Sequence, residues 1–243
     1  MPLLDVCFSP ELIHLYDLKG RVVVVVDILR ATSSMVTGLA HGLEKIIPVS
    51  TLAECQQFAS KGYLTAAERD GKKAEDFDLG NSPFSYMEDF VKGKTLAMTT
   101  TNGTHAIRLS LAADKVVVGA FLNVSSVAAY LVEQQKDVLV VCAGWKGKFN
   151  LEDTLFAGAL AHKLQGLFES ENDATLAAYH LYETAKSDLP LYLSKASHVQ
   201  RLKNLNITKD ITFCLQQDVY DIVPVLEGDY LVPYTPESVK SVV

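Results

Sequence analysis

The sequence predicts an α/β fold with three layers, in which a mostly parallel (mixed) sheet lies between helices. The run Val22–Val26 contains five consecutive β-branched residues, which fit a strand that is buried on both faces. Three segments repeat one order of apolar run, polar turn and helical pattern, and this order indicates strand–loop–helix units. A chain of 243 residues is also long enough to bury roughly three quarters of its unfolded surface.

The three units that predict the sheet share a strand, a loop and a helix. The first unit is a strand at Val22–Val26 with a helix from about Ser33 to Gly42. The second is a strand at Thr95–Met98 with a loop at Thr99–Gly103 and a helix at His105–Ala112. The third is a strand at Val138–Val141 with a loop at Cys142–Gly147 and a helix through Leu155–Leu164. Because parallel strands carry their following loops on one side, we expect these three loops to meet at one edge of the sheet.

Further elements are expected between and after these units. Between the units we expect strands at Lys45–Val49 and Lys115–Val118 and helices at Leu52–Lys61 and Val124–Gln134. Pro83 could begin a further helix that runs to Val91. After the units we expect helices at Ala174–Ser187 and Leu189–Leu205 and short strands at Ile211–Cys214 and Ile222–Val225. Since no linker rich in Pro, Gly or Ser divides the chain, residues 1–243 are interpreted as one domain. Residues 170–243 are the segment that could form a C-terminal subdomain.

The composition limits the partners and the compartment that the sequence predicts. The formal net charge is -7 and no run of lysine or arginine is present, so a nucleic-acid partner is not expected. The beginning of the chain lacks the pattern of a signal peptide and no apolar run is long enough for a spanning helix. We therefore expect a cytoplasmic protein without membrane association, and the apolar-rich composition leaves a homodimer open. The four cysteines have no paired spacing and are expected to be free and buried.

Asp27 and Arg30 follow the first predicted strand, and Thr32 begins the hydroxyl-rich start of the next helix. Ligands of open α/β sheets bind at this end of the strands, so an acid and an arginine there indicate a functional site. The alternative interpretation is a helix-capping aspartate that pairs with the arginine.

The loop Thr99–Thr104 follows the second strand and combines hydroxyls, an amide and a glycine. Such a loop at the beginning of a helix can bind phosphate or sulfonate oxygens. It lacks the spacing of a nucleotide-binding P-loop, and a threonine-rich turn with a helix cap is the alternative. The pair Glu68–Arg69 and the segment Phe77–Pro83, with Asp78 and Asn81, form another polar group, for which turn formation is equally plausible.

Glu152 and Asp153 open the third helix, where adjacent carboxylates also favour the helix dipole. One acid in each loop, from Asp27, Glu68, Asp78 and Glu152 or Asp153, would suit Mg²⁺, which prefers oxygen ligands and bridges to phosphate. The six histidines lack the spacing of a zinc site. His198 is a candidate for ligand contact, although a lone histidine on a helix is more often structural.

Several segments, in their order along the chain, resemble the 2-phosphosulfolactate phosphatase family. The resemblance rests on Asp27–Thr32, Glu68–Arg69, Phe77–Pro83, Thr99–Thr104, Gly119–Asn123, Cys142–Gly144, Leu151–Asp153, Ser197–His198, and Asp210–Ile211 with Val223–Pro224. It covers nearly the full length of the chain. One departure is Asp70, which adds an acid where the family commonly has a glycine-rich stretch.

The resemblance implies a Mg²⁺-dependent phosphatase that removes phosphate from 2-phospho-3-sulfolactate, a step toward coenzyme M. On this basis the expected catalytic residues are Asp27, Arg30 and Asp153, and the expected metal ligands are Asp27, Glu68, Asp78 and Glu152. The expected substrate-binding residues are Arg30, Thr32, Arg69, Asn81, Thr100, Thr101, Asn102, Gly103, Thr104 and Asn123.

The role of Asp27 is open at this point, since it could bind the metal or attack phosphorus itself. The DxD pattern of haloacid-dehalogenase-type phosphatases is missing, because Leu29 stands at its second acid. Two alternative functions also remain. One is a phosphatase for another small phosphorylated hydroxy acid, and the other is a non-catalytic module that binds a phosphorylated or sulfonated metabolite.

Overall fold

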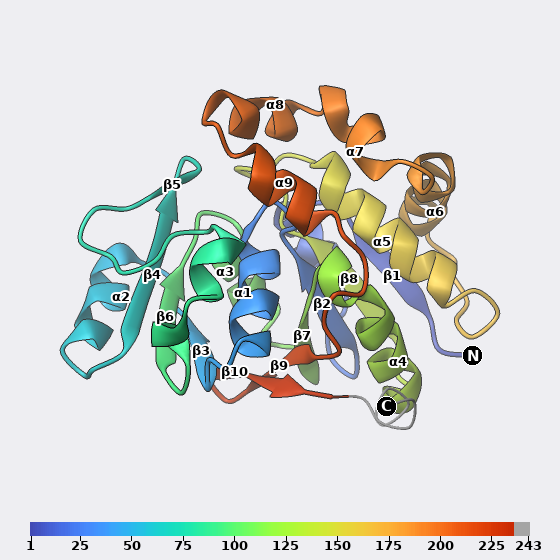
Figure 1. Cartoon of the computed structure of the whole chain (residues 1–243). Coiled ribbons are helices and arrows are strands. Elements are labelled where there is room, and N and C mark those ends of the chain that lie inside the picture. The colour runs from blue at the N-terminus through green and yellow to red at the C-terminus, as the bar shows by residue number, and fades with distance from the viewer. Residues whose placement is uncertain (236–243) are drawn as a thin grey trace.

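The computed structural model describes residues 1–235 of the chain, whose arrangement Figure 1 shows. Within them, ten strands form one mixed sheet in the order β1-β8-β2-β7-β9-β10-β3-β6-β4-β5. The strands are β1 (Leu4–Cys7), β2 (Val22–Val26), β3 (Lys45–Pro48), β4 (Leu64–Arg69), β5 (Lys72–Lys73), β6 (Thr95–Thr99), β7 (Lys115–Gly119), β8 (Val138–Cys142), β9 (Val223–Glu227) and β10 (Tyr230–Tyr234).

Two groups of parallel strands make up most of the sheet. In the first group β2 lies between β8 and β7, and Val22 stands opposite both Val138 and Lys115. In the second group β6 pairs in parallel with β3 and β4. The antiparallel hairpin of β9 and β10 joins the groups, and it lies crosswise at the lower end of the sheet in Figure 1. Three antiparallel pairings separate the two groups, but the loops after β2, β4, β6 and β8 still meet, because residues of all four line one cavity.

Strand β2 is the centre of the core. All five of its valines are completely buried, as are the five residues of β8 beside it. A strand that is covered on both faces needs apolar side chains at every position, which explains the uninterrupted valine run. A smaller apolar cluster lies under α2 (Leu52–Ala59) and contains Ile47, Cys55 and Phe77.

Helices pack against the sheet and complete the predicted fold class. Besides α2, the α-helices are α1 (Ala31–Ala40), α3 (Gly103–Leu109), α4 (Val124–Gln134), α5 (Leu151–Lys163), α6 (Asp173–Ala185), α7 (Leu189–Tyr192), α8 (Ser197–Asn204) and α9 (Thr208–Cys214). Helix α1 contacts β7, α2 contacts β4 and α5 contacts β8. Helices α7, α8 and α9 lie together across the top of the molecule in Figure 1. A mixed, mostly parallel sheet with these helices confirms the expected three-layer α/β/α architecture.

Three expected elements differ in the structure. The strand expected at Ile211–Cys214 is wrong, because these residues end α9. Ile211 and Cys214 are three residues apart and both buried, a spacing that places them on one face of a helix but on opposite faces of a strand. The helix expected at Leu189–Leu205 is interrupted between α7 and α8, and Pro83–Val91 contains two short 3-10 helices.

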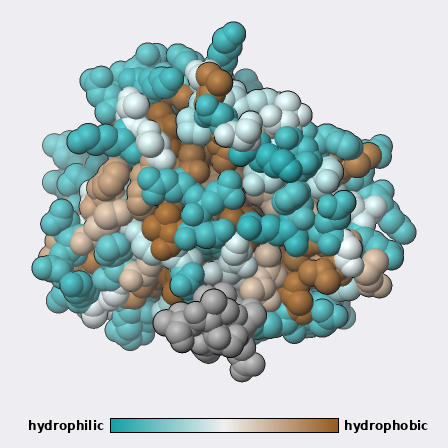
Figure 2. Space-filling model, turned by 45° about the vertical axis from the view of Figure 1, so that its right-hand side comes forward, coloured by the Kyte–Doolittle hydropathy of each residue, from teal (hydrophilic) through white to brown (hydrophobic). Residues whose placement is uncertain are grey.

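The C-terminal part of the described chain takes part in the central sheet as well as in the upper helices. The hairpin of β9 and β10 pairs with β7 and β3, while α6 packs against α5 and β1. All four cysteines are free and buried, as expected. No helix among the described residues is both long and apolar enough to cross a lipid bilayer. In Figure 2, the visible face carries hydrophobic residues scattered among hydrophilic ones.

Candidate active site

Loops from distant parts of the sequence meet around a small cavity of about 30 Å³. They follow β2, β4, β6 and β8, and α8 covers them. The cavity is lined by Asp27, Leu29, Arg30, Glu68, Gly71, Asn81, Asn102, Trp145, His198 and Leu202. Below, it is called the Asp27 cavity.

Asp27 stands directly after β2, and the first turn of α1 holds its backbone. Its N–H donates to the Thr32 hydroxyl at 3.0 Å, and the Thr32 N–H donates back to the Asp27 carbonyl at 3.0 Å. Thr32 is completely buried and does not line the cavity. The expected substrate ligand Thr32 therefore fixes the position of Asp27 instead of facing a ligand in this structure.

The electrostatic environment makes the Asp27 carboxylate costly to ionise. Burial, together with the nearby acids Glu68 and Glu152, raises its pKa to about 6, although His198 acts in the opposite direction. A cation near this group would favour the ionised form. The acids around Asp27 therefore add negative charge that a cation would offset.

Arg30 is buried at the wall of the cavity, and two partners fix its guanidinium. It forms an ion pair with Asp210 in α9, and it donates to the Gly71 carbonyl at 2.9 Å. The planar guanidinium has five N–H groups, so several remain for a ligand in the cavity that Arg30 lines. The sequence did not reveal Asp210 as the partner, because the two residues are far apart along the chain.

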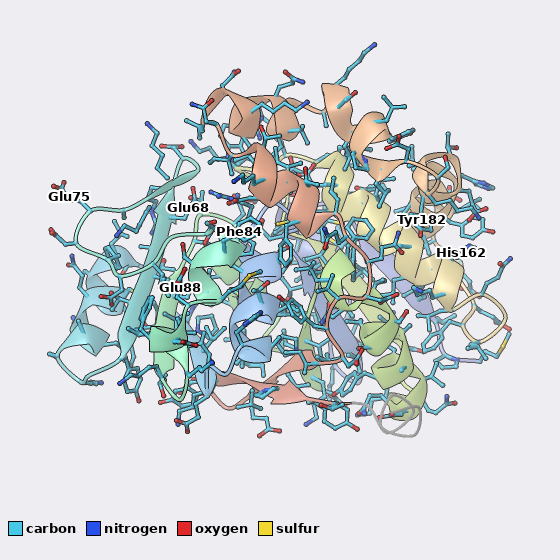
Figure 3. All side chains as sticks on the ribbon, in the orientation of Figure 1. Glu68, Glu75, Phe84, Glu88, His162 and Tyr182 are labelled. Carbon is cyan, nitrogen blue, oxygen red and sulfur yellow. The ribbon has the colours of Figure 1, made fainter. Side chains whose placement is uncertain are left out.

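Glu68 and Asn81 add oxygen atoms to the same cavity. Glu68 lies at the upper end of β4 in Figure 3, and its carboxylate accepts a hydrogen bond from the Gly71 N–H. The side-chain oxygen of Asn81 is buried and has no hydrogen-bond partner among the described residues. An unpaired buried carbonyl oxygen is unfavourable unless a ligand, water or metal ion satisfies it.

His198 faces the cavity from α8, and Glu152 holds its ring. The Nδ1 atom of His198 lies 2.5 Å from Oε1 of Glu152 and 3.3 Å from the Asn150 amide nitrogen. Glu152 is only 1% exposed, and its second oxygen has no partner in the described part of the chain. A histidine whose Nδ1 is held by a carboxylate presents Nε2 for proton transfer. A structural role was the more usual expectation for His198, because the sequence alone did not reveal its pairing with Glu152.

Asp153 lies behind the cavity and joins two of its loops. Its carboxylate accepts hydrogen bonds from the Ile28 N–H at 2.9 Å and the Gly144 N–H at 3.0 Å. Burial raises its pKa well above the usual range, and the neighbouring Glu152 and Asp27 raise it further. Asp153 does not line the cavity, so its position suits the support of the β2 and β8 loops.

Two further expected site residues lie away from the Asp27 cavity. Asp78 is exposed, and one of its oxygens accepts hydrogen bonds from the Thr65 N–H at 2.8 Å and the Thr65 hydroxyl at 2.9 Å. Asn123 is completely buried, accepts from the Ala120 N–H and donates to the Ile222 carbonyl, both at 2.9 Å. The structure brings neither side chain to the Asp27 cavity.

The loop Thr99–Thr104, called the threonine loop below, is divided between two cavities. Asn102 lines the Asp27 cavity, whereas Thr100, Thr101 and Thr104 line a separate groove of about 560 Å³ together with Arg69. Thr100 and Thr104 also close the turn, because the N–H of each donates to the hydroxyl of the other at 3.1 Å. The expected substrate ligands therefore do not form a single group.

A neighbouring hollow shares Trp145 with the Asp27 cavity and is also lined by Asp70 and Arg201. The guanidinium carbon of Arg201 lies 4.0 Å from the ring centre of Trp145, which lines the cavity. Next to it, Lys146 forms an ion pair with Asp70 at 3.0 Å. The additional acid at position 70 is therefore paired with a lysine from the β8 loop.

Comparisons with known proteins identify the family. A family model described as 2-phosphosulpholactate phosphatase matches residues 7–229. The chain belongs to the 2-phosphosulfolactate phosphatase family. It is 44% identical over 217 residues to a probable 2-phosphosulfolactate phosphatase of Caldanaerobacter subterraneus, covering 87% of this chain and 90% of the relative. Proteins with the same description from Thermotoga maritima (39% identity, 85% and 89% coverage) and Clostridium acetobutylicum (36%, 91% and 96%) are also similar. The predicted family is thus confirmed.

The Mg²⁺ that the family resemblance implies can be tested against the side chains of the cavity. Among residues 1–235, no three His, Cys, Asp or Glu side chains are placed to hold a metal ion together. The cavity does contain Asp27, Glu68 and the unpaired oxygen of Asn81. Mg²⁺ in phosphate sites commonly takes one or two carboxylates and completes its shell with water and substrate oxygens. The oxygen donors present fit that type of site.

Proposed function

We propose that this protein hydrolyses the phosphate ester of 2-phospho-3-sulfolactate in the Asp27 cavity, with Mg²⁺ as cofactor. Membership of the family confirms the predicted enzyme class, a phosphoric monoester hydrolase. The observation that carries the proposal is that Asp27, Arg30 and His198 line one cavity although they come from the loop after β2 and from α8. Together they offer an acid, a fixed positive charge and a group for proton transfer.

Arg30 is the proposed phosphate ligand. Its ion pair with Asp210 and its hydrogen bond to the Gly71 carbonyl hold the guanidinium in place before substrate binds. A guanidinium group that is already oriented loses little side-chain entropy when phosphate oxygens bind to its remaining N–H groups. The Asn102 amide lines the same cavity and is the second proposed contact.

Asp27 and Glu68 are the proposed protein ligands of Mg²⁺, with the Asn81 side-chain oxygen beside them. When bound, the metal ion would neutralise the negative charge that develops on the transferring phosphoryl group. The burial and neighbouring acids that raise the pKa of Asp27 support this assignment, because a divalent cation would offset them. Asp78 is not part of the proposed set, since its carboxylate is bound to Thr65.

His198 is the proposed acid–base group. Its Nε2 would accept a proton from water as the water oxygen bonds to phosphorus and the ester P–O bond breaks. The leaving alkoxide oxygen then takes the proton that Nε2 accepted, which returns His198 to its neutral form. Glu152 positions the ring through Nδ1 and stabilises the protonated imidazole. Attack by Asp27 itself is the alternative route, and a trapped aspartyl-phosphate that is absent from Asp27→Asn would demonstrate it.

The test of the proposed function is phosphate release from a panel of substrates. The panel contains 2-phospho-3-sulfolactate and other small phosphorylated hydroxy acids, each measured with Mg²⁺ and with excess EDTA. Highest Mg²⁺-dependent turnover of the sulfonated compound supports the proposal and the step toward coenzyme M. Preference for another panel member would reject the substrate but retain the reaction. Binding without any turnover would indicate a non-catalytic metabolite-binding module.

A further inference from the structure

A second polar groove opens on the other side of β4 and of the threonine loop. Glu68 lines the Asp27 cavity while its neighbour Arg69 lines this groove, as expected for successive residues on opposite faces of a strand. Asn102 and Thr101 are divided in the same way. No residue lines both spaces. The groove, called the Arg108 groove below, is therefore separate from the Asp27 cavity.

Positive charge in the Arg108 groove is not balanced by acids of the described chain. The side chains of Arg108 and His105 have no hydrogen bond or ion pair to any described residue, and the Arg69 side chain donates only to the Glu68 backbone carbonyl and the Thr99 hydroxyl. No Asp or Glu lines the groove. Two uncompensated guanidinium groups are unusual in a protein of net charge -7, where acids are abundant partners.

Two acids lie near the groove without neutralising it. Glu54 and Asp229 line an adjoining hollow that Arg108 also borders. The Glu54 carboxylate accepts a hydrogen bond from the Ser50 N–H at 2.9 Å and makes no ion pair with Arg108. The guanidinium of Arg108 is consequently available to an anion from solution.

Hydroxyl groups add hydrogen-bond donors next to this charge. The Thr101 and Ser50 side chains have no hydrogen-bond partner in the described part of the chain, and both line the groove. A planar guanidinium fork combined with hydroxyls matches the oxygens of a phosphate or sulfonate group. We propose that the Arg108 groove is a second anion-binding site, which takes the phosphate or sulfonate group of a small molecule independently of the Asp27 cavity.

The test follows the His105 imidazole resonances of the full chain by NMR while inorganic phosphate is added in EDTA. His105→Gln assigns the signal, and methanesulfonate repeats the titration with a sulfonate. Arg108 is exposed, so Arg108→Gln should fold normally. Lys115→Gln is the matched control, because it removes one exposed positive charge at the opposite end of the strands.

We expect a saturable shift of the His105 signal in the wild type, in Lys115→Gln and in Arg30→Gln. Loss of one charge-assisted contact should weaken phosphate binding about tenfold in Arg108→Gln. Equal affinity in Arg108→Gln, or no saturable shift in the wild type, would overturn the proposal. Loss of the shift in Arg30→Gln would also overturn it, because the anion would then bind to Arg30 in the Asp27 cavity. None of these results depends on turnover.

Discussion

The carboxylate of Asp27 lies directly against Gly103. A Cβ atom at position 103 would stand 3.0 Å from Asp27 Oδ2 and 2.8 Å from the Ala31 side chain. The glycine that begins α3 therefore allows the loop after β6 to approach the acid after β2. This contact joins the two parallel groups of the sheet at the proposed active site.

Gly103→Ala tests this contact. We expect the added methyl group to displace the Asp27 carboxylate or the threonine turn, and to lower kcat/KM by about tenfold to a hundredfold, since small misplacements of reacting groups slow catalysis strongly. The measurements are kcat/KM of Gly103→Ala and a double-mutant cycle with Asp27→Asn in unfolding free energy, taken in EDTA. If Gly103 contacts Asp27, the two changes in unfolding free energy are not additive. Unchanged kcat/KM in Gly103→Ala would show that the contact is irrelevant to catalysis.

Asp27→Asn should stabilise the metal-free protein while it removes activity. The folded-state pKa of Asp27 is about 6, above its ordinary value, so ionisation at higher pH acts against the fold. We expect a gain of about 2 kcal/mol in unfolding free energy at pH 8, measured by urea denaturation in EDTA. The gain should disappear near pH 4, where the wild-type carboxyl is protonated in the folded state. A constant difference at both pH values would contradict this account.

The pair of Glu152 and His198 should control proton transfer. We expect His198→Gln to lower kcat by about a hundredfold or more with little change in KM, as is usual when a general acid–base group is lost. Glu152→Gln should lower kcat less and should change the pH profile of kcat. Glu183→Gln is the matched control, because Glu183 pairs with His162 at 2.8 Å in another part of the molecule. Equal effects of Glu152→Gln and Glu183→Gln on kcat would show that Glu152 has no special role in proton transfer.

The ion pair between Asp70 and Lys146 should influence substrate access more than stability. Both side chains are largely exposed, so the pair contributes at most about 1 kcal/mol. Asp70→Asn should shift the thermal midpoint little, but it should change KM, because the pair lies beside the lining residues Gly71 and Trp145. Lys146→Gln should have the same effect on KM. Opposite changes in the two variants would show that the charges act separately.

The sequence predicted best what depends on local pattern. The valine run indicated the central buried strand, and the position of Asp27 after it indicated a site residue, because both follow from neighbouring residues. Pairings between distant residues could not be predicted in this way. Examples are Arg30 with Asp210 and Glu152 with His198, which become neighbours only when α8 and α9 cover the loops. Asp78 shows the converse, since a local bond to Thr65 occupies its carboxylate.

The most direct test of the account is phosphate release from 2-phospho-3-sulfolactate by the wild type and by Asp27→Asn, each with Mg²⁺ and with EDTA. The account predicts turnover only by the wild type with Mg²⁺, because Asp27 is a proposed ligand of the metal and the central acid of the cavity. Undiminished turnover by the wild type in EDTA, or by Asp27→Asn with Mg²⁺, would contradict it.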